Sequence, residues 1–292
     1  MSTSQSFIRK IAVLLEAIKF EHTVFALPFA LTAAVLAGGF PPIRVLGWIL
    51  LAMVGARSAA MAFNRIVDLR FDKLNPRTKG RALPAGALKL AEMWAFTIVA
   101  AGVLIYAAYR LNPLAFYLSP VALLVVMGYS YTKRFTSLSH LVLGLALGIA
   151  PTAAWIGVTG RIDLAPVALS AVVMFWTAGF DIIYAMQDVE FDRKLGLFSI
   201  PAKVGPSKAL SISRVFHAAA VLLLFAFGLM LKLGAVYYVG VAFVAGLLIY
   251  EQSLVKPDDL SKVDMAFFNT NGFVSIGYFL FALVDAFIRK AL

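Results

Sequence analysis

Long apolar stretches separated by short polar connections run through nearly the whole chain. Each stretch is about 20 residues long, the length that an α-helix needs to cross the hydrocarbon core of a bilayer. Turn-forming residues separate most neighbours cleanly, whereas only Lys232 and Gly234 divide the seventh stretch from the eighth. The pattern predicts about nine transmembrane helices, at 22–40, 44–66, 91–110, 113–132, 138–158, 165–186, 208–230, 234–252 and 266–288.

Composition supports lipid as the solvent of most of the chain. Of the 292 residues, 62% are hydrophobic and 14% are charged, and the mean hydropathy is +0.89. Soluble domains are about half apolar and about a quarter charged. The absence of cysteine excludes a disulfide scaffold, cysteine-ligated zinc and a thiol nucleophile. We therefore expect an all-α integral membrane protein with one transmembrane domain over residues 1–292.

The net charge of +11 follows the expected topology. With the N-terminus in the cytoplasm, 19 of the 26 Lys and Arg residues fall on the cytoplasmic side, six fall on the opposite side, and Arg57 lies within a span. This bias is the positive-inside pattern. It predicts a multi-pass protein of the cytoplasmic (inner) membrane, and it explains the basic charge without a nucleic-acid partner.

Two loops on the expected cytoplasmic side carry clusters of acidic side chains. In both, the core Asp-x-x-Phe-Asp is followed by a basic residue, and the two cores begin 120 positions apart, at Asp68 and Asp188. Such a repeat is typical of membrane proteins built from duplicated halves. We expect pseudo-repeat halves of about 1–136 and 137–292, each delivering one acidic cluster from the end of an even-numbered span.

Helical spacing gives these clusters a chemical meaning. Side chains four residues apart lie on one face of a helix, so the aspartates of each cluster form a ladder in which like charges repel. Oxygen-only ligands suit Mg²⁺, which favours carboxylates together with substrate phosphates. Basic and hydroxyl side chains that would hold phosphate oxygens follow both clusters: Arg77, Thr78, Lys79 and Arg81, then Arg193, Lys194 and Lys203. A solvated loop at a helix end explains one cluster, but two matching clusters on one face favour a metal-bound diphosphate site.

Three motifs together resemble those of the UbiA superfamily of intramembrane prenyltransferases. The first aspartate motif and its continuation are matched by Asn64, Asp68 and Asp72, then Asn75, Arg77 and Thr78. The second aspartate motif is matched by Asp181, Asp188 and Asp192, and a Tyr-x-x-x-Lys motif by Tyr129 and Lys133. The similarity covers essentially the whole chain. It implies a UbiA-like helical bundle with a central cavity.

The resemblance also implies substrates and roles. An aromatic polyprenyltransferase of quinone biosynthesis would bind a polyprenyl diphosphate and a small aromatic acid. Mg²⁺ would be held by Asp68, Asp72, Asp188 and Asp192. Diphosphate would be bound by Asn64, Asn75, Arg77, Thr78, Arg81, Tyr129 and Lys133, with Lys133 and the five aspartates, including Asp181, as catalytic residues. Ionisation of the diphosphate would leave an allylic cation, which the electron-rich ring attacks.

The acceptor is less sharply indicated than the reaction. Residues 18–28, at the entry to the first span, depart from the pattern of enzymes acting on 4-hydroxybenzoate. Together with residues 129–134 and 148–151, they resemble instead the futalosine-route menaquinone branch, whose acceptor would be a carboxylated dihydroxynaphthalene. The candidate acceptor contacts are Lys19, His22, Arg57 and Tyr184, although Lys19 and His22 would equally suit structural roles at the membrane boundary. 4-Hydroxybenzoate is the alternative acceptor.

The sequence disfavours two other functional classes and a metal-binding role for the histidines. An ion-coupled transporter would place its acids at mid-bilayer, whereas these lie at the ends of spans. Phosphatidyl transfer would need an Asp-Gly-x-x-Ala-Arg sequence, which is absent. His140 and His217 have no carboxylate at metal-ligand spacing and are interpreted as structural.

Overall fold

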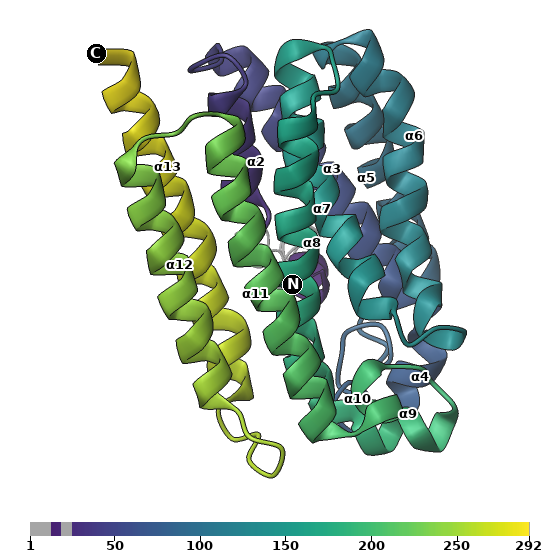
Figure 1. The fold of residues 1–292 in the computed structure, drawn as a ribbon. Coiled ribbons are helices and arrows are strands. Elements are labelled where there is room, and N and C mark those ends of the chain that lie inside the picture. The colour runs from purple at the N-terminus through teal and green to yellow at the C-terminus, as the bar shows by residue number, and fades with distance from the viewer. Residues whose placement is uncertain (1–12, 19–24, 292) are drawn as a thin grey trace.

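The computed structural model describes residues 13–18 and 25–291. In this part of the chain, eight helices are long and apolar enough to cross a membrane, some of them extended by short helical segments. Their regular cores form the up-and-down bundle of Figure 1: α3 (Ile43–Val67), α5 (Leu90–Leu111), α6 (Pro113–Gly128), α7 (Ser139–Thr159), α8 (Leu164–Ala185), α11 (Pro206–Met230), α12 (Ala235–Leu254) and α13 (Asn271–Ala291). The all-α membrane fold predicted from the apolar pattern is confirmed.

The first predicted span differs from the other eight. In the described residues it is represented by α2 (Leu27–Leu36), an apolar helix of 10 residues. A helix of that length rises about 15 Å, roughly half the hydrocarbon thickness of a bilayer. Pro28 stands at its first turn and Gly39, with a φ of 92°, follows its end. The weakly marked boundary at Lys232 and Gly234 is confirmed as the connection between α11 and α12.

α8 is the centre of the bundle and packs against both α7 and α11. Its buried side chains, among them Trp176 and Phe180, join a core shared with α2, α11, α12 and α13. The backbones of α7 and α8 approach so closely that a side chain at Gly144 or Gly148 would collide with carbonyl oxygens of α8. Small residues at such a crossing are typical of helix packing in membranes. The site-bearing end of α8 is thus held firmly against α7.

Short helices gather at one end of the bundle, called here the motif end (Figure 1). They are α4 (Leu69–Leu74), the 3₁₀ segments η2 (Tyr129–Arg134) and η3 (Met186–Asp188), α9 (Val189–Leu195) and α10 (Ile200–Val204). Asp68 lies between α3 and α4, Asp188 ends η3 directly before α9, and both have ψ close to zero. From the spacing we expected each aspartate motif to lie on one continuous helix. The structure instead shows a bend at Asp68 in the first motif and at Asp188 in the second.

Candidate functional site

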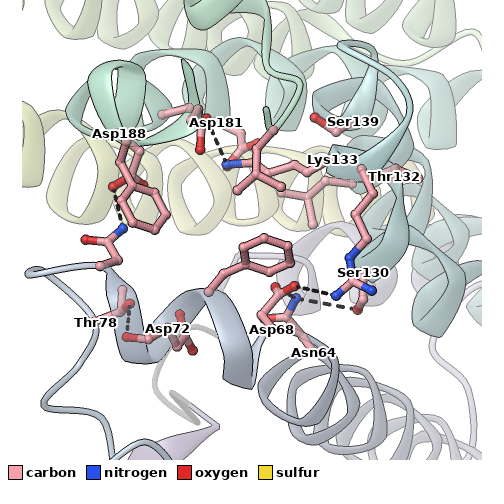
Figure 2. A pocket seen from close by; sticks show the side chains of 18 of the residues that line it. Asn64, Asp68, Asp72, Thr78, Ser130, Thr132, Lys133, Ser139, Asp181 and Asp188 are labelled. Carbon is pink, nitrogen blue, oxygen red and sulfur yellow. Dashed lines mark hydrogen bonds and ion pairs between the residues drawn. The ribbon is translucent and has the colours of Figure 1, made fainter. Parts of the chain in front are cut away.

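A polar cavity of about 220 Å³ opens at the motif end (Figure 2). Asp68 and Asp72 project from one wall, and Asp181 and Asp188 from the opposite wall. The predicted site residues that line it are Asn64, Asp68, Asp72, Asn75, Arg77, Thr78, Arg81, Tyr129, Lys133, Asp181, Tyr184, Asp188 and Asp192. The two loops, 120 positions apart in sequence, therefore contribute to one site.

Each of the four aspartates predicted to hold metal has a basic partner in the structure. Arg81 Nη1 donates to both carboxylate oxygens of Asp72, at 2.8 and 3.0 Å. The remaining pairs join Arg77 Nη2 to Asp188 at 2.5 Å, Lys133 Nζ to Asp192 at 3.6 Å and Arg134 Nη2 to Asp68 at 3.5 Å. Acidic and basic groups therefore alternate around the cavity, as binding a metal together with a polyanion requires.

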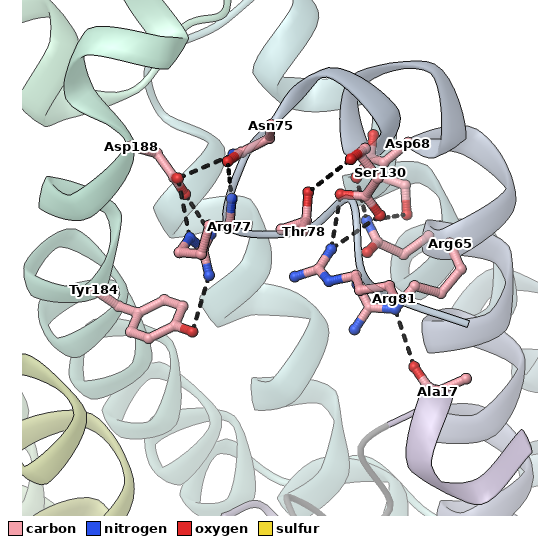
Figure 3. Close-up of polar contacts among 12 residues, drawn as sticks. Ala17, Arg65, Asp68, Asn75, Arg77, Thr78, Arg81, Ser130, Tyr184 and Asp188 are labelled. Carbon is pink, nitrogen blue, oxygen red and sulfur yellow. Dashed lines mark hydrogen bonds and ion pairs between the residues drawn. The ribbon is translucent and has the colours of Figure 1, made fainter. Parts of the chain in front are cut away.

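Asp188 ties the two loops together across the cavity (Figure 3). Arg77 approaches it through two guanidinium nitrogens, and Asn75 Nδ2 donates to its Oδ1 at 3.1 Å. The same arginine donates to the Tyr184 hydroxyl at 3.1 Å and lies over the Tyr184 ring. Two diphosphate ligands predicted in the first loop thus contact the acid predicted to hold metal in the second.

The first loop is organised around Asp68 and Asp72. Asn64 Nδ2 donates to Asp68 Oδ2 at 2.8 Å, and the Thr78 hydroxyl donates to the backbone oxygen of Asp72 at 3.2 Å. Burial raises the pKa of Asp68 above its usual range, and the charge of Asp72 adds to this rise. A divalent cation placed between the two carboxylates would remove that repulsion.

The donor chemistry of the cavity fits Mg²⁺ bound together with a diphosphate. In the described parts of the chain, three or more acidic, histidine or cysteine side chains nowhere gather closely enough to hold a metal by themselves. Mg²⁺ rarely uses such a cage and commonly binds one or two carboxylates, waters and substrate phosphates. The carboxylates of Asp68, Asp72, Asp188 and Asp192 face one cavity and would supply that partial shell from its two walls.

An apolar cavity of about 470 Å³ adjoins the polar one. It lies among α3, α5, α6, α7 and α8, and small side chains such as Ala56, Ala122 and Ala146 line it. Tyr129 and Leu143 line both cavities, so the two spaces meet beside them. Together they form the expected central cavity, with a charged end and an apolar interior.

The predicted acceptor contacts are dispersed. Tyr184 lines the polar cavity, and its ring packs on Phe267 with 4.2 Å between centroids. Arg57 lines the apolar cavity instead. Lys19 and His22 lie outside the described residues, so their assignment stays a prediction.

Several residues in or beside the polar cavity were not predicted from the sequence. Ser130, Thr132 and Arg134 line the cavity beside Lys133, and their adjacency to the Tyr-x-x-x-Lys motif was the available signal. His140, interpreted as structural, lies with its Nδ1 2.7 Å from Oδ2 of Asp181. These two residues are 41 positions apart and meet only because α7 packs on α8.

Comparisons with known proteins concern the family and the fold of the chain. A sequence model described as "UbiA prenyltransferase family" matches residues 26–275. The chain is 32% identical over 260 residues to the 4-hydroxybenzoate solanesyltransferase of Synechocystis sp., covering 89% of this chain and 88% of that protein. It is 37% identical to a solved UbiA homolog from Aeropyrum pernix K1, with a TM-score of 0.82 and coverage of 93% and 98%. A UbiA homolog from Archaeoglobus fulgidus, solved bound to GPP and Mg²⁺, shares the fold at 20% identity, with a TM-score of 0.74 and coverage of 94% and 99%.

Proposed function

Because the chain belongs to the UbiA prenyltransferase family, we propose that it transfers a polyprenyl group from a polyprenyl diphosphate to 4-hydroxybenzoate. The observation that carries this proposal is the junction of the two cavities at Tyr129 and Leu143. A substrate with an anionic head and a long apolar tail matches a charged cavity that continues into an apolar one. A soluble anion would need only the first cavity.

The acids and bases of the polar cavity have complementary parts in the reaction. Mg²⁺, when bound by the four aspartates, would neutralise charge on the departing pyrophosphate. Arg77, Arg81 and Lys133 contact those aspartates in the structure. With a metal bound to the carboxylates, these three cations would be free to bind the phosphate oxygens, and the planar guanidinium groups of the two arginines would do so through pairs of hydrogen bonds.

The apolar cavity would hold the prenyl chain and keep water from the allylic cation. Its walls are mainly apolar side chains from five helices. The exceptions are one charged residue, Arg57, and four residues with hydroxyl groups, which are Ser119, Tyr129, Thr152 and Ser170. Exclusion of water prevents capture of the cation as a prenyl alcohol. Tyr129, at the junction, would present its ring to the cation.

The choice of acceptor follows the relatives. The Synechocystis protein is named for 4-hydroxybenzoate, which favours this acceptor over the carboxylated dihydroxynaphthalene expected from residues 18–28. Mg²⁺ as the metal is supported by the donor set and by the metal-bound fold relative. The positive-inside bias supports a polar cavity open to the cytoplasm. The acids lie at or near the ends of α3 and α8, which disfavours the ion-coupled transporter.

The proposal is tested with detergent-purified protein and octaprenyl diphosphate, with prenylated product quantified by mass spectrometry. We expect product from 4-hydroxybenzoate with Mg²⁺ and none when the metal is chelated. A dihydroxynaphthoate offered in parallel should react at least about tenfold more slowly, since a pocket shaped for one ring discriminates against a second by a few kcal/mol. Faster reaction of the naphthoate would overturn the acceptor, and transfer to neither acid would overturn the reaction.

A further inference from the structure

Asp181 differs from the other four aspartates of the polar cavity in its partner. Asp68, Asp72, Asp188 and Asp192 each face an arginine or lysine side chain. In the described residues, Asp181 pairs instead with His140, which is completely buried, while the Asp181 side chain is one-fifth exposed and lines the cavity. Within the described residues, Asp181 is therefore the acid of the cavity that a histidine, rather than a lysine or arginine, holds in place.

The hydrogen bonds of His140 define its protonation state. The backbone N–H of Ile200 donates to His140 Nε2 at 3.2 Å, so this nitrogen carries a lone pair and no proton. The ring proton therefore lies on Nδ1 and is donated to Asp181 Oδ2 at 2.7 Å. His140 is thus a neutral imidazole that orients one oxygen of Asp181, and in the described residues no lysine or arginine forms an ion pair with this carboxylate.

Asp181 also lies at a suitable depth. It precedes Asp188 by seven residues, nearly two helical turns and about 10 Å of rise along α8 and η3, so it lies on the same wall of the cavity and nearer the interior of the bundle. A carboxylate–metal bond and a metal–phosphate bond of about 2 Å each, followed by the P–O–C linkage, cover most of that distance. The reacting carbon of a prenyl diphosphate anchored at Asp188 therefore comes close to the level of Asp181.

We propose that Asp181, oriented by His140, is the base that removes the ring proton from the prenylated intermediate. The step rests on the proposed function. The C–O bond of the prenyl diphosphate breaks and its electron pair leaves with pyrophosphate. A π pair of the acceptor ring then forms the new C–C bond. The ring C–H bond finally gives its pair back to the ring, and its proton passes to the Asp181 carboxylate. His140 is a positioning residue, since it acts only through Asp181.

The test compares kcat for 4-hydroxybenzoate with kcat for the same acid deuterated at the ring carbons beside the hydroxyl-bearing carbon. In the parent protein, rapid deprotonation gives a ratio near one. In Asp181→Asn the lost base makes deprotonation limiting, so kcat falls about tenfold and the ratio rises to about two or more. Pyrophosphate release in a first turnover is retained, because the metal-binding acids are intact.

Three further variants separate orientation from folding, each checked by its thermal unfolding in detergent. His140→Asn keeps an N–H at the Nδ1 position and keeps the ratio near one, whereas His140→Leu removes the donor and raises it. Asp163→Asn, at the other end of α8, is the matched control and leaves the ratio unchanged, since Asp163 pairs with Trp155 and Arg161.

Two results would overturn the assignment of Asp181 as the base. A ratio near one in both Asp181→Asn and His140→Leu overturns the assignment of the base. Loss of first-turnover pyrophosphate release in Asp181→Asn also overturns it, because that places Asp181 in the ionisation step. Failure of the proposed function is distinct, since the parent protein would then prenylate neither form of the acid.

Discussion

Asp188→Asn should lower kcat/KM for prenyl transfer by about a thousandfold, the scale on which a group that stabilises developing charge contributes. Asp188 is the acid on which both loops converge, through Asn75 and Arg77. The amide keeps the size of the side chain and removes one of the negative charges that would bind metal. Product formation measured over a range of prenyl diphosphate concentrations at fixed Mg²⁺ checks the expectation.

Glu190→Gln is the matched control, because Glu190 is an exposed acid in α9 that does not line the polar cavity. It should change kcat/KM less than about threefold, as surface substitutions commonly do. Equal losses in the two variants would show that general charge at this end of the bundle matters. Activity of Asp188→Asn near that of the parent protein would remove the metal-site assignment of the second loop.

Ala122→Trp should separate long substrates from short ones. Ala122 lines the apolar cavity from α6, and an indole there would occupy space assigned to the distal prenyl units. We expect kcat/KM for octaprenyl diphosphate to fall about a hundredfold, because displacement of a bound substrate by an ångström or more carries a cost of that order. Geranyl diphosphate, whose two units remain near Tyr129, should react at a nearly unchanged rate.

Leu124→Trp controls for the bulk of the new side chain. Leu124 is on the same helix, is 74% exposed and lies outside the cavity lining. This variant should retain both activities. Equal losses for geranyl and octaprenyl diphosphate in Ala122→Trp would contradict the tail assignment, as would unchanged transfer of the longer chain.

The pattern of neighbouring residues was sufficient to predict the transmembrane helices and the aspartate motifs. A run of apolar residues must be a helix in lipid because its backbone groups have no other partners, and eight predicted spans are long helices. The aspartate motifs were recognisable from their repeated spacing, and all five acids reached one cavity. The short α2 was not foreseen, because the apolar stretch continues beyond the helix into the Gly38–Gly39 turn.

Long-range pairing was not readable in the same way. Nothing local indicates that Arg77 faces Asp188, or that His140 reaches Asp181. The bends at Asp68 and Asp188 depend on where each helix leaves the bundle. Arg57 shows the same limit: its sequence position fits a site residue, yet it lies on the apolar cavity. The internal duplication stays a prediction, although the two bends occur at matching motif positions.

The central claim, that the two loops form one metal–diphosphate site, is tested most directly by calorimetric binding of a non-reactive prenyl thiolodiphosphate. The account predicts binding that requires Mg²⁺ and that weakens at least about tenfold in either Asp68→Asn or Asp188→Asn, one acid from each loop. It also predicts that the double variant loses much less than the sum of the two single losses, because both acids act on one bound ligand. Metal-dependent binding of parent strength in either single variant would contradict a shared site.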